Sequence, residues 1–429
     1  MKITDYRVTP IAFGDPPLRA AMGLHAPYAL RTVVEIVADD GTTGVSETHG
    51  GAAVVDDLLA IGELVVGRDP FHLAELEARV GGGGGRYGGD GTKFWEGRLH
   101  SPPRTYGAIE VACLDLLGKA TERSVCDLLG GPVRERVDFS AYLFSKHAGA
   151  GGAHGFGADP AAIGGWDAAR QREALCAEGL VAQSLAMTDA FGFASIKLKA
   201  GVLEPDEEVR TIRLLREAYG PDTPLRIDPN AAWSLETALR VAGELEGLLE
   251  YYEDPVGGKA QMAELAKRTR LPLATNMCCV SFADLPETIA RGSVQIILGD
   301  HHFWGGLRAS VELARICRTW GIGMSMHSNS HMGISLAAMT HLAAAVPNLT
   351  YACDTHYPWQ ADELIVGGKL RFEDGSLAVP AGPGLGVELD RAALERMHRQ
   401  YLASGLTHRD DEIEMQKVEP GWRARFPRW

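Results

Sequence analysis

The sequence has few of the features that mark membrane, secreted or disulfide-bonded proteins. Its 429 residues include seven cysteines, an odd number scattered along the chain without a Cys-x-x-Cys pair. Such usage argues against a disulfide framework and indicates reduced thiols in a cytoplasmic protein. The apolar runs fall well short of about 18 residues, so no transmembrane helix is predicted. The first residues also lack the apolar core of a signal peptide.

Positive charge is scarce as well. The chain carries 42 Lys and Arg residues against 56 Asp and Glu residues, which gives a formal net charge of −14. This balance argues against nucleic acid or an anionic membrane as a partner. The glycine-rich stretch 81–91 contains no Gly-x-x-x-x-Gly-Lys-Ser/Thr motif. It therefore predicts a surface loop rather than a phosphate cradle.

The sequence has enough apolar residues for a large core. Its first part also shows both helical and strand-like patterns. It is 45% hydrophobic and 23% charged, an ordinary globular composition, and it is long enough for a barrel with a smaller partner domain. Residues 32–38 alternate like a half-buried strand, turn at 39–41 and return over 43–47. Helical periodicity follows at 55–66, 71–80 and 109–117. An α+β domain is predicted for this part of the chain.

From about residue 137 the pattern changes to strands that alternate with helices. A first strand over 137–143 is followed by a long Gly/Ala-rich connection, 146–165, which is either an insertion or an ordered loop over a site. The repeating units of about 25 to 45 residues argue for a parallel sheet. After residue 379 the repeat stops, and a helix over 393–402 precedes a polar tail. Helices within the repeat are predicted at 173–191, 206–219, 234–249, 282–291, 307–320 and 334–345.

Polar residues end one predicted strand after another. Strands that begin at residues 195, 225, 249, 273, 294, 322 and 351 end at Lys199, Asp228, Glu253, Asn276, Asp300, His327 and Asp354. A doubly wound sheet and a closed barrel both fit the alternation. An open sheet concentrates its chemistry at one switch point, whereas a barrel collects side chains from all of its strands at one mouth. Because so many successive strands carry reactive residues, a barrel is predicted.

Three of these strand ends offer the oxygen ligands that hard cations prefer. Asp228, Glu253 and Asn276 lie on consecutive predicted strands, about one strand–helix unit apart. Any one of them alone would more often be a surface or loop-capping residue. Three in register at one barrel mouth predict a Mg²⁺ site, since this ion takes oxygen ligands and keeps positions open for substrate.

Two further strand ends offer groups that can accept a proton. Lys197 and Lys199 point to the same side of their strand, and a lysine held beside another cation and a metal can have a depressed pKa. The alternative for this pair is two solvated lysines. His327 is the second candidate base, with Asp300 one strand earlier able to orient it. Bases on two sides of a metal predict removal of a proton next to a substrate carboxylate.

These motifs resemble the enolase superfamily, in its mandelate-racemase-like subgroup and specifically its glucarate dehydratase family. The resemblance covers nearly the whole chain. Asn at the third metal position is a rather specific feature, because most of the superfamily uses Asp or Glu there. The matching segments are His-Ala-Pro at 25–27, Tyr142, Lys-Leu-Lys at 197–199, Asp-Pro-Asn at 228–230, Glu-Asp-Pro at 253–255, Ala-Thr-Asn-Met at 274–277, Asp300 with His-Phe-Trp at 302–304, His-Ser-Asn at 327–329, Asp-Thr-His at 354–356 and Arg-Asp-Asp at 409–411.

The resemblance implies an α/β fold, a modified TIM barrel of the (β/α)7β type at residues 131–384. An α+β capping domain at 1–130 would close over the barrel mouth, and a C-terminal segment at 385–429 would pack back on that domain. The implied metal is Mg²⁺, held by Asp228, Glu253 and Asn276. The implied bases are Lys199 and the His327–Asp300 pair. The residues implied to hold a hexarate diacid are His25, Tyr142, Lys197, Asn230, Asn276, Asn329, His356 and Arg409.

The implied reaction is that of a hydro-lyase. It would dehydrate D-glucarate, and its C5 epimer L-idarate, to 5-dehydro-4-deoxy-D-glucarate, with Mg²⁺ stabilising the enediolate. We expect a homo-oligomer that acts on a small molecule. The alternatives are another acid-sugar dehydratase or epimerase, or a non-catalytic relative that binds the metal and the sugar acid. One departure bears on the second metal ligand: residues 257–259 are Gly-Gly-Lys, where glucarate dehydratases often carry a further Glu.

Overall fold

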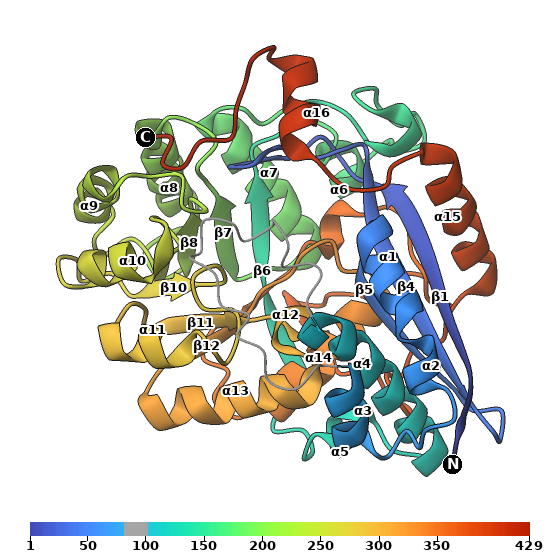
Figure 1. The fold of residues 1–429 in the computed structure, drawn as a ribbon. Helices are drawn as coiled ribbons and strands as arrows, with labels where there is room; N and C mark the ends of the chain where they lie inside the picture. Colours follow the sequence, from blue (N-terminus) through green and yellow to red (C-terminus); the bar gives the residue numbers. More distant parts are fainter. Residues whose placement is uncertain (81–101) are drawn as a thin grey trace.

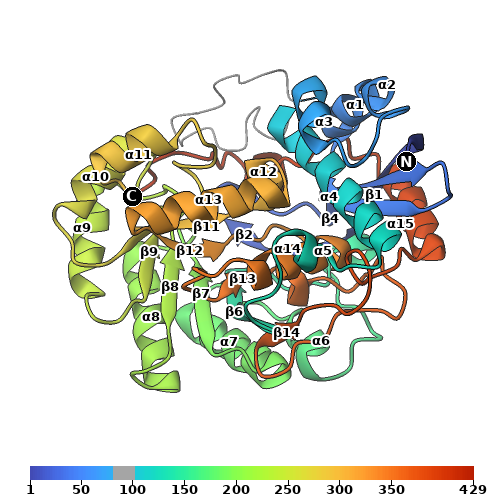
Figure 2. The same ribbon diagram turned by 90° about the horizontal axis from the view of Figure 1, so that it is seen from below.

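A three-stranded antiparallel sheet and a parallel barrel make up the computed structural model, which describes residues 1–80 and 102–429 (Figure 1; Figure 2). The predicted fold class is confirmed: a modified TIM barrel carries an N-terminal α+β capping domain. The glycine-rich stretch 81–91 lies outside the described residues. The domain boundaries after residues 130 and 384 stay predictions.

The capping sheet has the strand order β1–β4–β5, formed by β1 (Ile3–Gly14), β4 (Tyr28–Ala38) and β5 (Thr43–His49). Between β1 and β4, the short hairpin of β2 (Arg19–Ala20) and β3 (Gly23–Leu24) leads the chain to His25. The single helix predicted over 55–66 is interrupted at Ile61 and forms two helices. The helices of this part are α1 (Ala52–Ala60), α2 (Gly62–Val65), α3 (Leu73–Val80), α4 (Pro102–Thr121) and α5 (Val125–Leu128).

Eight parallel strands form a nearly closed barrel in chain order, and the last of them returns to pair with the first. Parallel strands place all of their carboxyl ends at one mouth. The strands are β6 (Arg136–Phe144), β7 (Ser195–Lys199), β8 (Leu225–Asp228), β9 (Tyr251–Glu253), β10 (Leu273–Thr275), β11 (Ile296–Gly299), β12 (Gly323–Met326) and β13 (Cys353–Asp354). A further strand, β14 (Ser376–Ala378), pairs antiparallel with β6.

Helices cover the outside of the barrel, as Figure 2 shows for α7 to α11 and α13. Ser234 caps α9 as predicted, since its hydroxyl accepts the Thr237 N–H at 3.2 Å. This helix ends at Glu244 rather than at 249, because Gly247 takes a φ of 78° that breaks it. The helices are α6 (Gly165–Ala169), α7 (Ala177–Phe191), α8 (Pro205–Tyr219), α9 (Leu235–Glu244), α10 (Gly258–Ala266), α11 (Leu285–Arg291), α12 (His301–Trp304), α13 (Leu307–Trp320) and α14 (Gly333–Ala345).

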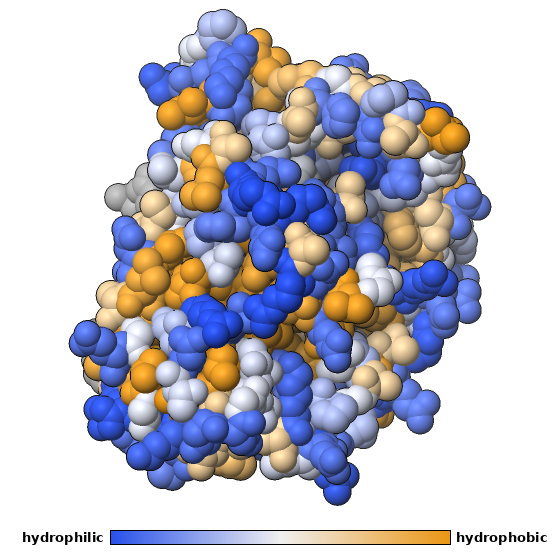
Figure 3. All heavy atoms as spheres, turned by 90° about the vertical axis from the view of Figure 1, so that its right-hand side faces the viewer, coloured by the Kyte–Doolittle hydropathy of each residue, from blue (hydrophilic) through white to orange (hydrophobic). Residues whose placement is uncertain are grey.

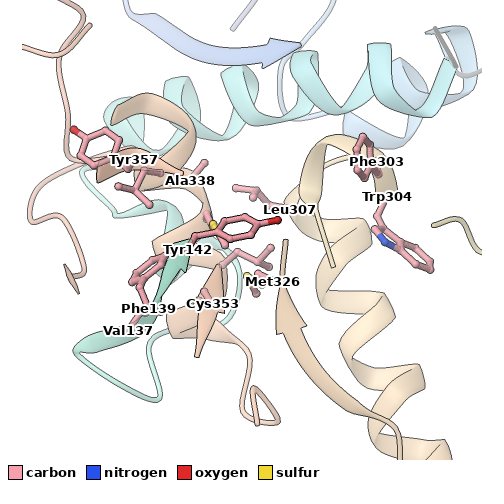
Figure 4. Close-up of a cluster of buried hydrophobic side chains, with 14 of the residues drawn as sticks. Val137, Phe139, Tyr142, Phe303, Trp304, Leu307, Met326, Ala338, Cys353 and Tyr357 are labelled. Atoms are coloured by element: carbon pink, nitrogen blue, oxygen red, sulfur yellow. The ribbon is translucent and has the colours of Figure 1, made fainter. Parts of the chain in front are cut away.

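One apolar core runs through the barrel wall and the capping domain. Helix α14 belongs to it with every residue buried, and it packs against β5, β6 and α13. Figure 4 shows Val137 and Phe139 of β6 and Cys353 of β13 gathered near Tyr142, with Ala338 of α14 beside them. This shared core fixes the capping domain on the barrel. In the described ranges, no helix has the length and apolar character needed to cross a bilayer.

The C-terminal segment crosses the capping sheet and then returns to the barrel. Helix α15 (Arg391–Ser404) lies along β1, with His398 Nδ1 2.7 Å from the Pro10 carbonyl oxygen. The predicted polar tail contains a further helix, α16 (Asp411–Val418), and beyond it Arg428 donates to the carbonyls of Ala21 and Gly201. Figure 3 shows the face on the α15 side, where polar and apolar residues are interspersed.

The packing of α4 on β5 depends on Gly44. A Cβ at this position would lie 2.0 Å from the Ala112 carbonyl oxygen and 2.6 Å from Leu116 Cβ. Gly44→Ala should therefore lower the free energy of unfolding by about 1–3 kcal/mol, the usual cost of overpacking. The measurement is the urea midpoint of unfolding.

The matched control is Gly243→Ala in α9. This glycine is exposed, and in the described part of the chain no neighbouring atom lies within 4 Å of an added Cβ. The substitution should raise the free energy of unfolding by about 0.5–1 kcal/mol, because alanine loses less backbone entropy in a helix. A Gly44→Ala midpoint equal to that of the unsubstituted protein would contradict the close packing.

Candidate active site at the barrel mouth

The carboxyl ends of the barrel strands bring the predicted metal ligands and bases to one buried mouth. Lys197, Asp228 and Glu253 are fully buried, and the others are at most 8% exposed. They converge because each closes or follows a strand of the same parallel sheet. The set is Lys197 and Lys199 on β7, Asp228 on β8, Glu253 on β9, Asn276 after β10, Asp300 after β11 and His327 after β12.

Lys197 is the centre of the charged group at this mouth. Its Nζ lies 2.6 Å from Glu253 Oε2, 2.7 Å from Asp354 Oδ2 and 3.6 Å from Asp228 Oδ2. Lys199 Nζ donates to Asp228 Oδ2 at 2.7 Å. Three buried carboxylates therefore face two ammonium groups. The buried guanidinium of Arg226 lies 3.8 Å from Asp354 Oδ1 but also pairs with Glu250 at 2.6 Å, so the carboxylates still outnumber the cations.

Glu253 is the least compensated of these carboxylates. Neither of its oxygens accepts a hydrogen bond from the described residues, despite the close ion pair with Lys197. Burial, and then the charge of Asp228, raise the pKa of Glu253 well above its ordinary value. The Asn276 side-chain nitrogen is also buried without a partner in the described ranges. A divalent cation among these oxygen donors would offset the excess charge, so the set fits Mg²⁺.

The loop after Glu253 brings no further carboxylate to this group. Lys259 Nζ lies 2.7 Å from Asp284 Oδ1, at the start of α11. Asp254 turns to the next strand, where it accepts the Thr275 hydroxyl at 2.5 Å and the Asn276 N–H at 2.8 Å. Asp254 therefore positions the turn that carries Asn276, while Glu253 faces the lysines.

The turns beside these carboxylates have strained backbone. Asn230 and Ala231 have φ values of 49° and 61°, and Asp254 has a φ of 37°. Non-glycine residues in this left-handed region cost about 1–3 kcal/mol each and persist where surrounding contacts hold them. Asn230 is held through its backbone N–H and side-chain amide, which donate to Asp228 Oδ1 at 3.1 and 2.9 Å. The strain accompanies the positioning of Asp228, which is typical of a functional turn.

The pKa values of Lys197 and Lys199 are raised, whereas the sequence suggests a depressed pKa. Burial alone would lower the pKa of Lys199, but the charge of Asp228 raises it above its ordinary value. The pKa of Lys197 is likewise raised against the effect of burial, by Asp354 and Glu253. The reason is that the carboxylates around Lys197 and Lys199 outnumber these two lysines.

Asp300 is shared between two histidines. His327 Nδ1 lies 2.9 Å from Asp300 Oδ2, and His302 Nδ1 lies 2.8 Å from Asp300 Oδ1. Burial opposes ionisation of Asp300, yet the two imidazoles hold its pKa well below its ordinary range. Sequence reasoning missed His302 as a site residue. The signal was its place two residues after Asp300, but spacing alone does not show which way the ring turns.

A second group of predicted residues comes from distant parts of the chain. The ring of His356 lies 5.9 Å from that of His25 and 5.6 Å from that of Tyr142. Tyr142 joins this group to the lysines, since Lys197 Nζ lies 4.8 Å from its ring. Neither ring nitrogen of His356 has a hydrogen-bond partner within the described ranges, and burial lowers the pKa of His356 to about 3. A buried polar group of this kind suits a bound ligand.

Two carboxylates that sequence reasoning did not assign to the site, Asp15 and Asp411, pair with His25 and Arg409. His25 Nδ1 lies 2.9 Å from Asp15 Oδ2, and both residues are buried. Arg409 pairs with Asp411 through Nε at 2.5 Å and Nη2 at 2.6 Å. Asn329, two residues after His327, is half-buried, and its side-chain oxygen lies 3.5 Å from the Ser330 hydroxyl.

Asp300, His301 and His302 also offer ligand atoms within 4.8 Å of one another. Both oxygens of Asp300 are already engaged by imidazoles, and His302 Nε2 lies 3.2 Å from Arg31 Nη2. A cation at this place would meet the fixed positive charge of the guanidinium. The arrangement therefore favours a hydrogen-bonded network over a metal centre.

Residues 179–393 match the family model described as Enolase C-terminal domain-like, over half of the chain. The chain belongs to the enolase superfamily. The predicted membership is confirmed, and the match runs from α7 into α15 through all of the barrel strands after β6.

Several relatives of this superfamily are similar over the full length. A probable glucarate dehydratase of Streptomyces coelicolor is 44% identical over 452 aligned residues, 100% of this chain and 99% of its own. A Mycobacterium smegmatis enolase solved with tartrate is 50% identical, with a TM-score of 0.91 over 100% of this chain and 98% of its own. A Pseudomonas fluorescens enolase with magnesium, potassium and tartrate is 47% identical, with a TM-score of 0.91 over 100% and 99%.

Proposed function

We propose that this protein is a Mg²⁺-dependent hydro-lyase that dehydrates D-glucarate, and its epimer L-idarate, to 5-dehydro-4-deoxy-D-glucarate. The observation that carries the proposal is the pair of candidate bases, Lys199 from β7 and His327 from β12, around a mouth rich in uncompensated carboxylate charge. The full-length similarity to a probable glucarate dehydratase supports the substrate class.

Asp228, Glu253 and Asn276 are the proposed ligands of the metal. When bound, Mg²⁺ would supply positive charge to the substrate carboxylate beside the carbon that loses its proton. An amide as the third ligand keeps the protein's contribution at two negative charges, which suits a dianionic substrate. The magnesium in the related P. fluorescens structure supports this choice of ion.

His327 and Lys199 are the proposed bases, each for one epimer. Because His327 Nδ1 is engaged by Asp300, Nε2 is the nitrogen that takes the proton. Ligation of a cation by Asp228 would draw that carboxylate's charge away from Lys199 Nζ, which favours the neutral amine in the loaded enzyme. Once protonated, His327 is the acid that can donate to the departing β-hydroxyl.

The remaining predicted residues would hold the diacid. His25, His356 and Arg409 offer donors to the far carboxylate. The main support for this role is the ring of His356, whose nitrogens have no partner in the part of the chain that the structure describes. The residues proposed to hold the end of the diacid that reacts lie on or beside the barrel strands. They are Lys197, Tyr142, Asn230, Asn276 and Asn329.

A second candidate function is the dehydration of another hydroxy-diacid, which the tartrate in two related structures favours. A screen of hexarates and tartrate with Mg²⁺ separates the two candidates.

The metal assignment predicts that Asp228→Ala and Glu253→Ala each lose Mg²⁺ binding and activity together, because each removes one of two charged ligands. Isothermal titration calorimetry measures the binding. Lys259→Ala is the matched control, since Lys259 faces Asp284 and should leave Mg²⁺ affinity unchanged. Unchanged Mg²⁺ affinity in Glu253→Ala would show that the second ligand is another residue.

The substrate assignment predicts that Arg409→Ala raises the KM for D-glucarate by about 10- to 100-fold, since a charge-assisted hydrogen bond is worth about 1.5–3 kcal/mol. Steady-state kinetics measure the effect. Arg399→Ala on α15 is the control, because Arg399 is exposed and only loosely paired with Glu395. A severe loss of thermal stability in Arg409→Ala, with normal kinetics in the folded fraction, would count against a substrate role.

The two-base arrangement predicts a dependence on the epimer. Lys199→Ala should retain dehydration of D-glucarate better than that of L-idarate, with losses of about 10²- to 10⁴-fold for the affected epimer. His327→Ala should be the poorer enzyme for both, because His327 also supplies the acid. Turnover of each epimer and uptake of deuterium at the α-carbon in D₂O test this. Equal losses for both epimers in Lys199→Ala would refute the two-sided model.

A further inference from the structure

Asp300 contacts His327 through one oxygen, and its other oxygen begins a hydrogen-bond network that runs through His302 into the capping sheet. Asp300 Oδ1 accepts the backbone N–H of His302 at 2.9 Å and lies 2.8 Å from the Nδ1 of the same residue. His302 Nε2 lies 3.2 Å from Arg31 Nη2 on β4 and 3.0 Å from the Glu47 carbonyl oxygen on β5. Asp300, His302, Arg31 and Glu47 are at most 3% exposed, so water does not compete with these contacts.

The contacts on the two sides of His302 fix where its proton lies. A guanidinium only donates, so a bond from Arg31 makes His302 Nε2 an acceptor and leaves the proton on Nδ1. If His302 Nε2 instead donates to the Glu47 carbonyl, Nδ1 must carry a second proton, because it faces an oxygen of the ionised Asp300 carboxylate, which only accepts. In both states His302 donates to Asp300 Oδ1.

The capping sheet holds this arrangement through the buried pair of Arg31 and Glu47. Arg31 Nε donates to Glu47 Oε1 at 2.8 Å. The Glu47 carboxylate accepts the N–H groups of Met332 and Ser335 at 3.0 Å each, where α14 begins. Arg31 Nη1 reaches the Asn329 carbonyl at 3.4 Å. The same pair therefore contacts His302 and also the segment that directly follows His327.

We infer that His302 is a positioning residue for His327, acting through Asp300, and that Arg31 and Glu47 hold it in place. The inference rests on the proposed function, because it concerns one of the two proposed bases. With Oδ1 engaged by His302, the carboxyl plane of Asp300 is fixed and Oδ2 faces His327 Nδ1. The low pKa of Asp300 is consistent with this double engagement. Lys199 lies outside the network, so its proton transfers do not depend on His302.

The test uses the amide side chains as partial replacements for the imidazole. Asn places its amide N–H close to the former Nδ1, and Gln places it close to the former Nε2. In His302→Asn the bond to Asp300 is retained, whereas in His302→Gln and His302→Leu it is lost. Each variant is assayed as the full chain with Mg²⁺ for α-proton exchange in D₂O, with D-glucarate and with L-idarate. The epimer whose exchange is lost in Lys199→Ala serves as the internal reference.

The expected result is a loss confined to the epimer that His327 serves. His302→Leu and His302→Gln should reduce that exchange by about 10- to 100-fold, the worth of one hydrogen bond to a charged group. Exchange of the reference epimer should stay near the level of the unsubstituted protein, and His302→Asn should restore most of the lost exchange. A general disturbance of the fold would lower the rate of α-proton exchange for both epimers alike.

Two results would overturn the inference: equal losses for both epimers, or no difference between His302→Asn and His302→Gln. The Asn and Gln pair decides the question even if His302→Leu does not fold, because the two amides carry the same donor group and differ by one methylene, which moves the donor from the former Nδ1 to the former Nε2. Failure of the proposed function looks different. In that case the unsubstituted protein exchanges neither epimer under the same conditions.

Discussion

Buried carboxylates that outnumber their lysine partners are the constraint on which the barrel mouth depends. Asp228, Glu253 and Asp354 come from three strands and meet at Lys197 on a fourth. Removing one partner from such a buried group costs about 3–5 kcal/mol, so the four strand ends are bound to one arrangement. The same shortage of positive charge makes the mouth receptive to a divalent cation. Stability and the proposed chemistry thus have a common origin.

The capping domain reaches this mouth at two separate places. Asp15 and the neighbouring β2–β3 hairpin hold His25 near His356, whose ring nitrogens have no hydrogen-bond partner among the described residues. The pair of Arg31 and Glu47 reaches the second place, where Arg31 contacts His302 and the segment that follows His327, one of the two proposed bases. If the proposed function holds, the capping sheet influences both the choice of diacid and the geometry of proton transfer, although its strands belong to no part of the barrel.

The barrel and the residues at its mouth could be predicted because period and order in the sequence determine them. Parallel strands put every carboxyl end at one edge, so Asp228, Glu253 and Asn276 had to meet once the strands were recognised. The partners of His302 could not be found this way, because Arg31 lies 271 residues away and meets it only through the docking of the capping sheet. The raised pKa of Lys199 depends on a distance of 2.7 Å to Asp228, which no spacing encodes.

The placement of α15 along β1 has a consequence for how the protein is made. The outer side of β1 is covered by a helix that begins at Arg391, and Ala21 accepts a hydrogen bond from Arg428, 407 positions later. A ribosome adding about 5–20 residues per second needs roughly 20–80 s between these segments. Throughout that interval, β1 of the nascent chain lacks its covering helix. The capping sheet is thus synthesised long before the helix that completes it.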